Sequence, residues 1–231
     1  MSSKRSKQAS AFIALCAVIY FVSYITRNSY NSAISEITEA LHTTKDMTGL
    51  VGTAAFLTYG IGQIICGVLG DYIAPRYMIL MGVGATSVCN LAMPFMGGNV
   101  TAMVVLWGIN GFAQAMFWPP LVRLMAEHLS GRDYNDAVVA VTTASSFGNI
   151  FVYILSPICI ALSGWNLIFY VTGAAGLAMM AFWSSSVTFH HSFMVRVPSA
   201  SRAWPLASRQ HAPELIRWMK PPFSRATPST S

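Results

Sequence analysis

Arg27 is the residue whose position most strongly suggests chemistry, because it lies inside a long apolar stretch that runs from Ala11 to Ile34. At about 1.5 Å per residue, a helix of this length crosses a hydrocarbon layer of about 30 Å. A guanidinium there costs at least ~2.5 kcal/mol on insertion scales, so it should face a water-filled cavity or the interior of a helix bundle. Spacings of four, three and four residues put a polar and aromatic stripe on one helix face: Tyr20, Tyr24, Arg27 and Asn31.

A single positive charge on such a stripe predicts a binding site for an anion. The alternative is a structural arginine that pairs with backbone carbonyls or caps a shorter helix. Two other apolar stretches carry polar stripes at intervals of three or four residues, which are Asn110, Gln114 and Trp118 in one and Thr142, Ser146, Asn149, Tyr153 and Ser156 in the other. Such side chains often only hold membrane helices together. Stripes on three spans, one with an arginine, favour a cavity.

The composition of the chain is that of a membrane protein. Of its 231 residues, 54% are hydrophobic and only 10% are charged, whereas a soluble domain carries about 25% charged residues. The net charge of +6 does not indicate a nucleic-acid partner, because six of the fourteen Lys and Arg residues follow residue 190 and the others mostly flank apolar stretches. The four cysteines lie in apolar stretches and are expected to be buried thiols: Cys16, Cys66, Cys89 and Cys159.

Six apolar stretches are long enough to cross a membrane. They predict spans over Ala11–Ile34, Thr48–Leu69, Tyr77–Met96, Ala102–Met125, Ala137–Leu162 and Asn166–Trp183. Short loops between them force neighbouring spans to be antiparallel. The predicted fold class is therefore an all-α membrane bundle, with spans one, two, four and five around a wet cavity and spans three and six outside them facing lipid.

The distribution of basic residues predicts the orientation of the bundle. The loops on one side offer only Lys45, whereas the amino terminus and the loops on the other side carry Lys4, Arg5, Lys7, Arg76 and Arg132. By the positive-inside rule, both termini are then cytoplasmic. We expect a multi-pass protein of the plasma (inner) membrane.

The chain divides into a cytoplasmic amino terminus over residues 1–10, the six-span bundle over 11–185 and a basic tail over 186–231. The tail holds six of the eleven prolines and no apolar stretch of crossing length, a composition typical of disordered segments. Its abrupt change of character suggests a truncated or frame-shifted product, with a natural basic linker as the alternative.

The sequence has no set of residues suited to catalysis or to holding a cofactor or metal. It shows no paired carboxylates inside a span, no Ser/His/Asp set, no metal-binding cluster and no phosphate-binding loop. The chain is therefore not expected to be an enzyme. A carrier that couples transport to protons usually needs an acidic residue or a histidine inside the membrane. Here Asp71, Glu127 and His128 lie only at span ends. Exchange of one solute for another is the simpler mechanism.

Three short motifs lie in or between the spans: Tyr24-Ile25-Thr26-Arg27-Asn28, the segment Gly67–Arg76, and the segment Trp107–Pro120 with Arg123 after it. Together they resemble the major facilitator superfamily. More narrowly, they resemble its organophosphate:phosphate antiporters, the carriers of glycerol 3-phosphate and hexose phosphates. The resemblance covers about residues 10–185.

The resemblance implies roles for the motif residues. The family has an arginine that binds substrate phosphate at the point of its first helix that Arg27 occupies. The segment around Asp71 and Arg76 is similar to the signature loop between helices two and three, although it lacks the basic residue after the aspartate and a later glycine. The most specific similarity is to the fourth helix of the family, through Asn110, Gln114, Trp118, Pro119 and Pro120.

The resemblance also implies twelve helices in two six-helix bundles, each built from two inverted repeats of three helices, with alternating access and exchange of a phosphate ester for inorganic phosphate. This chain supplies only the amino-terminal bundle. The second phosphate-binding arginine of the family lies in the seventh helix, which this chain does not have. The expected partners are the lipid bilayer, a small anionic solute, and either a missing second bundle or a second copy of the chain.

Arg27 is thus predicted to bind the anionic group of the solute by paired hydrogen bonds. The residues predicted to line the site are Tyr24, Asn28, Asn31, Gln114 and Asn149. Asp71 and Arg76 are predicted to form a cytoplasmic latch, with Arg123 in the same gate and Asn110, Trp118, Pro119 and Pro120 as further motif residues. Two alternatives remain open, which are a non-transporting membrane fragment and a carrier of this fold for a carboxylate such as a sugar acid.

Overall fold

The computed structural model describes residues 2–129 and 131–189, and their regular structure is helical. In chain order the elements are α1 (Ser2–Ala40), α2 (Lys45–Leu69), α3 (Pro75–Ala92), the 3-10 helix η1 (Met93–Met96), α4 (Val100–Gln114), α5 (Trp118–His128), α6 (Arg132–Ser163) and α7 (Asn166–Phe189). Within this described part, six segments are long and apolar enough to span a membrane, with η1 continuing α3 and α5 continuing α4. The predicted bundle of six spans is confirmed, and its last helix runs a few residues beyond the expected boundary at 185.

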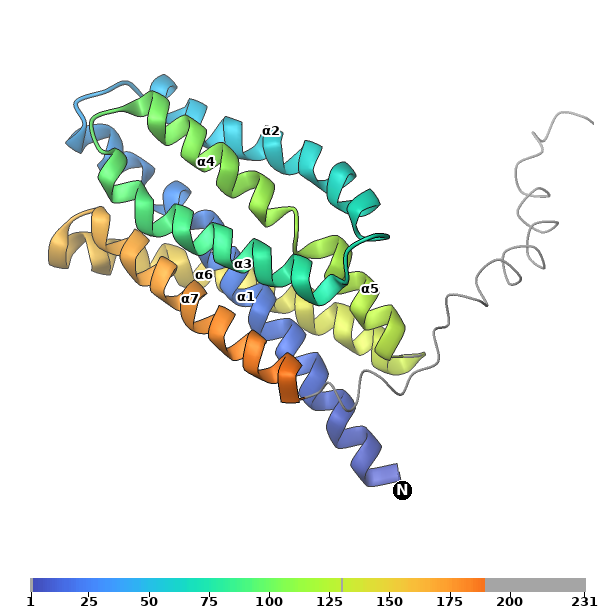
Figure 1. Ribbon diagram of the computed structural model, residues 1–231. Coiled ribbons are helices and arrows are strands. Elements are labelled where there is room, and N and C mark those ends of the chain that lie inside the picture. The colour runs from blue at the N-terminus through green and yellow to red at the C-terminus, as the bar shows by residue number, and fades with distance from the viewer. Residues whose placement is uncertain (1, 130, 190–231) are drawn as a thin grey trace, which may run out of the picture. The chain divides into compact units, whose positions relative to one another are not determined.

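The six spans alternate in direction along the long axis of the bundle (Figure 1). The start of α1, the α2–α3 loop, the end of α5 and the end of α7 lie at one end of the bundle. Lys7, Arg76 and Arg132 belong to this end, whereas Lys45 opens α2 at the opposite end. The basic residues therefore gather at one end, as the sequence predicts.

Local sequence signals set the helix ends. The side chain of Thr44 accepts a hydrogen bond from the Met47 amide at 3.4 Å, and that of Asn99 accepts one from the Ala102 amide at 3.1 Å. Both side chains thus cap amide groups that the first turn of a helix leaves free. Helix α6 ends at Ser163 and is followed by Gly164, whose φ of 75° suits a residue without a side chain.

The fourth span is a broken helix. Pro119 and Pro120 have no amide hydrogen to donate, so an α-helix cannot run through them without losing bonds. The chain instead makes a tight turn over residues 115–117, whose amides donate to carbonyls three residues earlier at 3.1, 3.1 and 3.3 Å. Helix α5 then begins at Trp118 with the two prolines in its first turn. The apolar stretch Ala102–Met125 therefore crosses as two helices.

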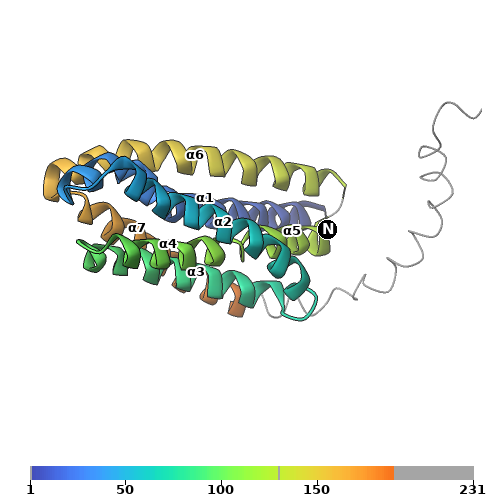
Figure 2. The same cartoon turned by 90° about the horizontal axis from the view of Figure 1, so that it is seen from above.

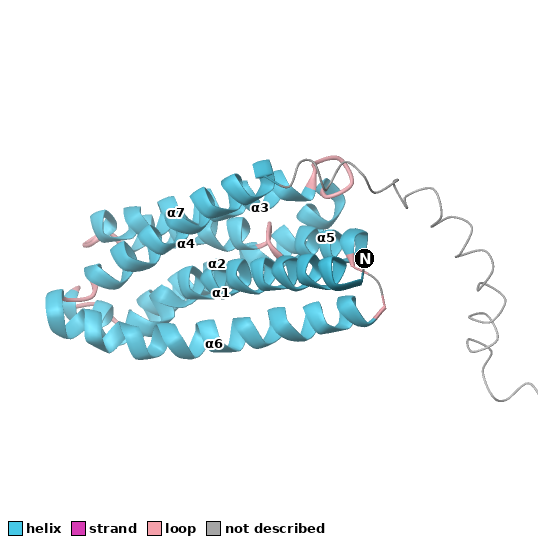
Figure 3. Ribbon diagram, turned by 90° about the horizontal axis from the view of Figure 1, so that it is seen from below, coloured by secondary structure: helices cyan, strands magenta, loops and turns pink. Residues whose placement is uncertain are grey.

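Three interfaces dominate the packing: α1 with α6, α2 with α4, and α3 with α7. Each joins one of the first three spans to one of the last three. If the first three spans are exchanged with the last three, α1 takes the place of α4, α2 that of α6 and α3 that of α7. The α1–α6 pair then becomes the α4–α2 pair, and the α3–α7 pair is unchanged. This pattern is the one expected of two three-helix repeats related by a twofold axis. Figures 2 and 3 show α6 beside α1 at one edge of the bundle and α3 and α7 toward the opposite edge.

Glycines allow the close packing in these interfaces, as one on α6 and one on α4 illustrate. A Cβ atom on Gly148 of α6 would lie 2.7 Å from the carbonyl oxygen of Phe21 in α1, and one on Gly111 of α4 would overlap the carbonyl oxygen of Ala55 in α2. Only a residue without a side chain lets the backbones approach this closely. The glycines thereby fix how α2 and α6 lie against the centre of the bundle.

The spans differ strongly in how much surface they bury. In the most apolar window of α2 and of α6 only 17% of the residues are buried, against 50% in α3 with η1. The third span, expected to lie outside the others and face lipid, is therefore among the most buried of the six. Helices α2 and α6, expected to surround a cavity, leave most of their surface open in the bundle.

Candidate functional site

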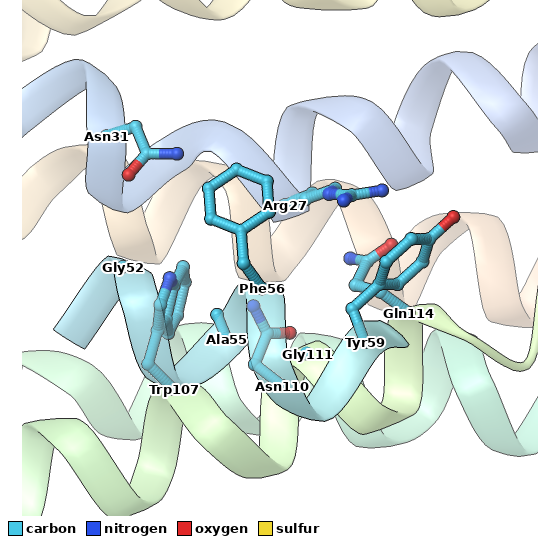
Figure 4. Close-up of a pocket in the computed structure, with 10 residues that line it drawn as sticks. All are labelled: Arg27, Asn31, Gly52, Ala55, Phe56, Tyr59, Trp107, Asn110, Gly111 and Gln114. Carbon is cyan, nitrogen blue, oxygen red and sulfur yellow. The ribbon is translucent and has the colours of Figure 1, made fainter. Parts of the chain in front are cut away.

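A small pocket lies among α1, α2 and α4, close to the middle of the spans (Figure 4). A water-sized sphere has about 20 Å³ of space in it, which is roughly enough for one water molecule. The lining residues are Arg27 and Asn31 from α1, Gly52, Ala55, Phe56 and Tyr59 from α2, and Trp107, Asn110, Gly111 and Gln114 from α4. Three of the four spans predicted to surround a cavity contribute, and α6 does not.

Three aromatic rings surround the guanidinium group of Arg27. Its guanidinium carbon lies 3.9 Å from the centre of the Tyr59 ring and 5.8 Å from the centres of the Tyr24 and Phe56 rings. Such cation–π contacts contribute about 0.5–2 kcal/mol, depending on how dry the site is. No described residue forms a salt bridge with Arg27 or accepts a hydrogen bond from it. Its five N–H donors are therefore available to an anion.

A second polar region lies deeper, where α1, α3, α4 and α7 meet. Asn90 of α3 is fully buried. Its amide nitrogen donates to the carbonyl oxygens of Thr26 and Thr86 at 2.9 Å each, and its amide oxygen accepts from Ser29 at 2.7 Å and from Thr172 at 2.9 Å. All four bonds of the Asn90 amide are thus made inside the protein, so this residue joins helices and leaves no group for a solute.

Gln114 and Asn110 belong to both regions. The amide nitrogen of Gln114 donates to the hydroxyl groups of Thr86 at 2.8 Å and Thr26 at 3.2 Å, and the Thr86 hydroxyl donates to the amide oxygen of Asn110. Both residues also line the pocket beside Arg27. They therefore connect the buried network of Thr26, Ser29, Thr86, Asn90, Asn110, Gln114 and Thr172, called the interior network below, to the candidate site.

The other residues predicted to line the site have different surroundings. Tyr24 contacts Arg27, and its ring centre lies 5.3 Å from that of Tyr20. Asn28 donates to the Tyr24 carbonyl at 3.2 Å and accepts a long bond of 3.4 Å from Asn31, so its contacts stay within α1. Asn149 is exposed on α6, in a shallow hollow apart from the Arg27 pocket.

The structure places Asp71 and Arg76, the two residues of the predicted latch, in different contacts. Asp71 pairs with Arg123 of α5, with 3.9 Å between Oδ1 and Nη1, and the same guanidinium donates to Glu127 at 2.8 Å and to the carbonyl of Gly70. Arg76 instead lies over the Tyr77 ring. The structure therefore brings Asp71 together with Arg123 and not with Arg76, because Arg123 projects from α5 toward the end of α2. The gating roles predicted for Asp71, Arg76 and Arg123 stay predictions.

Trp118, Pro119 and Pro120 form the first turn of α5. The Trp118 ring contacts the Tyr20 ring in a tilted arrangement with 5.4 Å between their centres, and Tyr20 contacts Tyr24 in the same manner. The motif therefore does two structural things, because the prolines break the fourth span and the tryptophan extends the aromatic contacts that lead to Arg27.

The second span was expected to border the cavity, but the residues that α2 brings to the site were not predicted. Tyr59 and Phe56 supply two of the three rings around Arg27, and Gly52 and Ala55 make room beside them. A signal existed, since Gly52, Ala55 and Tyr59 recur every three or four residues and share one helix face. In the part of the chain that the structure covers, no group of three or more His, Cys, Asp or Glu residues could hold a metal. The four cysteines are free and buried, as predicted.

A family model for the Major Facilitator Superfamily matches residues 16–217, which is most of the chain. The chain belongs to this superfamily. The order of the six spans and the twofold pattern of their interfaces agree with that assignment.

Curated relatives of this superfamily member support the narrower resemblance. A probable hexose phosphate transport protein of Chlamydia trachomatis is 28% identical over 69% of this chain and 35% of its own length. A glycerol-3-phosphate transporter of Bacillus subtilis is 28% identical over 72% and 34%. A membrane sensor protein, UhpC of Salmonella typhimurium, is 28% identical over 71% and 37%. The chain spans about a third of the length of these relatives. They are transporters and a sensor, which agrees with the prediction that the chain is not an enzyme.

Proposed function

We propose that this chain is the solute-binding amino-terminal half of a carrier that moves a small phosphorylated solute, such as a sugar phosphate or glycerol phosphate, in exchange for inorganic phosphate. The observation that carries the proposal is Arg27, a cation in the middle of a membrane bundle with no carboxylate within ion-pair distance among the described residues. A charge in that position is expensive unless an anion neutralises it. The named relatives that carry hexose phosphate and glycerol 3-phosphate support the choice of a phosphorylated solute.

The unpaired charge also gives a reason for exchange. Alternating access requires the site to pass from one side of the membrane to the other through a closed state. With the site empty, the closed state would bury Arg27 without a counter-ion, whereas a bound phosphate group supplies one. The bundle would therefore change conformation readily only when loaded, and the phosphate ester and inorganic phosphate would use the same guanidinium in turn.

A second six-helix bundle would complete the carrier. The open surfaces of α2 and α6 are where we place it, because these two spans bury the least surface within the bundle. A second copy of this chain is the other way to supply it, and the mass of the purified particle distinguishes the two. We place the basic end of the bundle, with Lys7, Arg76 and Arg132, in the cytoplasm of a cell bounded by a plasma (inner) membrane.

The cluster of Arg123, Asp71, Glu127 and the Gly70 carbonyl is proposed to act at the cytoplasmic gate. It ties the end of α2 to α5 below the break in the fourth span. Because the side chains of Arg123 and Asp71 are 41% and 82% exposed, the contact is weak enough to open and close.

The proposal is tested by flux. The chain, purified with the second bundle or second copy that completes the carrier, is reconstituted into liposomes loaded with inorganic phosphate, and uptake of labelled glycerol 3-phosphate and glucose 6-phosphate is followed. Uptake should require internal phosphate, and Arg27→Lys should reduce it by about tenfold or more, because an ammonium cannot make the paired hydrogen bonds of a guanidinium. Uptake that is equal in phosphate-free liposomes, or equal in Arg27→Lys, would contradict the proposal. Competition with glucuronate tests the sugar-acid alternative.

A sensor is the second candidate, because a membrane sensor protein is among the relatives. A sensor would bind the solute and change conformation without moving it. Saturable binding of glycerol 3-phosphate that depends on Arg27, together with no flux in loaded liposomes, would favour this function over transport. A chain that neither binds nor transports would match the non-transporting fragment considered from the sequence.

A further inference from the structure

We propose that Gln114 accepts a hydrogen bond from a hydroxyl group of the solute, and that Thr86 is the positioning residue that holds the Gln114 amide in the orientation this requires. The inference rests on the proposed function, because it takes the pocket beside Arg27 as the solute site. It adds which residue of this chain recognises a hydroxyl group of that solute, beside the recognition of its anionic group by Arg27.

Gln114 donates hydrogen bonds to two threonine hydroxyl groups of the interior network. Its amide nitrogen lies 2.8 Å from the Thr86 hydroxyl oxygen and 3.2 Å from the Thr26 hydroxyl oxygen. A side-chain amide has two hydrogens on its nitrogen. Both are therefore directed into the interior network and away from the pocket.

The hydrogen bonds around Gln114 favour one orientation of its amide. The Thr86 hydroxyl hydrogen is donated to the amide oxygen of Asn110, and the Thr26 hydroxyl hydrogen to the carbonyl oxygen of Ser23 at 3.0 Å. If Gln114 were flipped, its oxygen would face two hydroxyl oxygens whose hydrogens are already engaged. The polarity of the interior network thus sets the orientation of the Gln114 amide.

The remaining polar atom of the Gln114 side chain is its amide oxygen, which can only accept hydrogen bonds. No described residue donates a hydrogen bond to this oxygen. It is also not one of the fully buried side-chain atoms without a partner, so it keeps some contact with open space. Figure 4 shows the Gln114 side chain on the same side of the pocket as Arg27 and Tyr59. An acceptor with no donor is costly inside a membrane protein, so a donor from the pocket is expected.

The pocket beside Arg27 and Gln114 is small. About 20 Å³ fits roughly one water molecule, or one hydroxyl group of a larger solute. Arg27 offers donors to an anion, whereas Gln114 offers an acceptor to a hydroxyl. An alkyl phosphate without hydroxyl groups satisfies only the first, and a site built around a hydroxyl discriminates against an analogue that lacks it.

The test compares two ligands of equal length, glycerol 3-phosphate and propyl phosphate, by equilibrium binding to the purified full chain in lipid nanodiscs. The parent should prefer glycerol 3-phosphate by about tenfold or more. Gln114→Met and Thr86→Val should bring this ratio close to one by weakening only the binding of glycerol 3-phosphate. Thr86→Ser should restore the ratio, because it keeps the hydroxyl group.

Thr172→Val is the matched control. Thr172 belongs to the interior network through Asn90 and has no hydrogen bond to Gln114 among the described residues, so its loss should lower stability and leave the ligand ratio unchanged. A parent that binds both ligands equally, or a ratio that survives in Gln114→Met, would overturn the inference alone. A parent that binds neither ligand would overturn the proposed function together with the inference.

Discussion

Thr26 and Arg27 are neighbours in α1, yet they belong to two regions with opposite properties. Thr26 is fully buried, and its hydroxyl and carbonyl groups are both engaged in the interior network. Arg27 is half-buried and contacts rings but no hydrogen-bond acceptor in the described chain. Polar groups of the first kind hold membrane helices together, and a charge of the second kind is available to a ligand.

The two regions also draw on different helices. The interior network joins α1 and α4 to α3 and α7, whereas the pocket joins α1 and α4 to α2. Helices α1 and α4 therefore have one face fixed by satisfied hydrogen bonds and another facing the candidate site. Rigid support next to an unsatisfied cation is an arrangement that keeps the geometry of a binding site constant.

The largest effect is expected from breaking the interior network. Asn90→Leu removes four buried hydrogen bonds and leaves their partners unpaired, which should destabilise the bundle by about 3 kcal/mol. Asn149→Leu makes the same replacement at an exposed position on α6 and should have little effect. Thermal unfolding of both variants in detergent gives the comparison, and equal midpoints would mean that the network does not hold the bundle.

A somewhat smaller effect is expected from the α2–α4 contact that forms the pocket. Gly111→Ala places a methyl group against the Ala55 carbonyl and should destabilise by about 2 kcal/mol through overpacking. Gly60 has open space around it, so Gly60→Ala should be neutral or slightly stabilising. The fraction of each variant that elutes as folded protein measures this difference, and a well-behaved Gly111→Ala would show that the two helices lie further apart.

Removing a ring should sharpen the view of the pocket itself. Tyr59→Leu takes away the face nearest to the Arg27 guanidinium, and the loss of about 0.5–1 kcal/mol should weaken glycerol 3-phosphate binding two- to fivefold. Tyr153→Leu alters an exposed tyrosine of α6 outside this pocket and serves as the control in the same binding assay. Equal affinities in the two variants would remove the ring from the account of the site.

The smallest effect is expected at the cytoplasmic cluster. Arg123→Gln breaks contacts to Asp71 and Glu127 that are partly exposed to solvent, so the loss of stability should stay below about 1 kcal/mol and shrink at high salt. Thermal unfolding at low and high ionic strength measures it. A large loss that salt does not change would point to a structural role through the Gly70 carbonyl instead.

The sequence predicts the spans well because apolar length and basic loop residues report directly on the membrane. It predicts Arg27 because a charge inside such a stretch is conspicuous. It does not predict the depth of α3, since Asn90 looks the same in sequence whether it faces lipid, a cavity or other helices. It likewise does not predict the contact of Tyr59 with Arg27 or that of Asp71 with Arg123, because both contacts depend on how α2 packs against distant helices.

Residues 190–231 of the tail lie outside the described part of the chain, so the predicted disorder and aberrant origin of the tail stay predictions, although the family match continues to residue 217. The roles of Asn28 and Asn149 in binding likewise stay predictions. Asn28 bonds within its own helix, and Asn149 lies on a different surface from the pocket. A second bundle that covers α6 is the condition under which Asn149 would meet the solute.

Cysteine labelling tests the contrast between the two regions most directly. The four native cysteines are buried, so an anionic sulfonate thiol reagent should leave the parent unlabelled. Asn31→Cys, beside Arg27 in the pocket, should react, more slowly when Arg27→Gln is added, and glycerol 3-phosphate should protect it where glycerol does not. Ser29→Cys, on the buried face, should stay unlabelled. Labelling of Ser29→Cys but not of Asn31→Cys, or no protection by glycerol 3-phosphate, would contradict an anion site at Arg27.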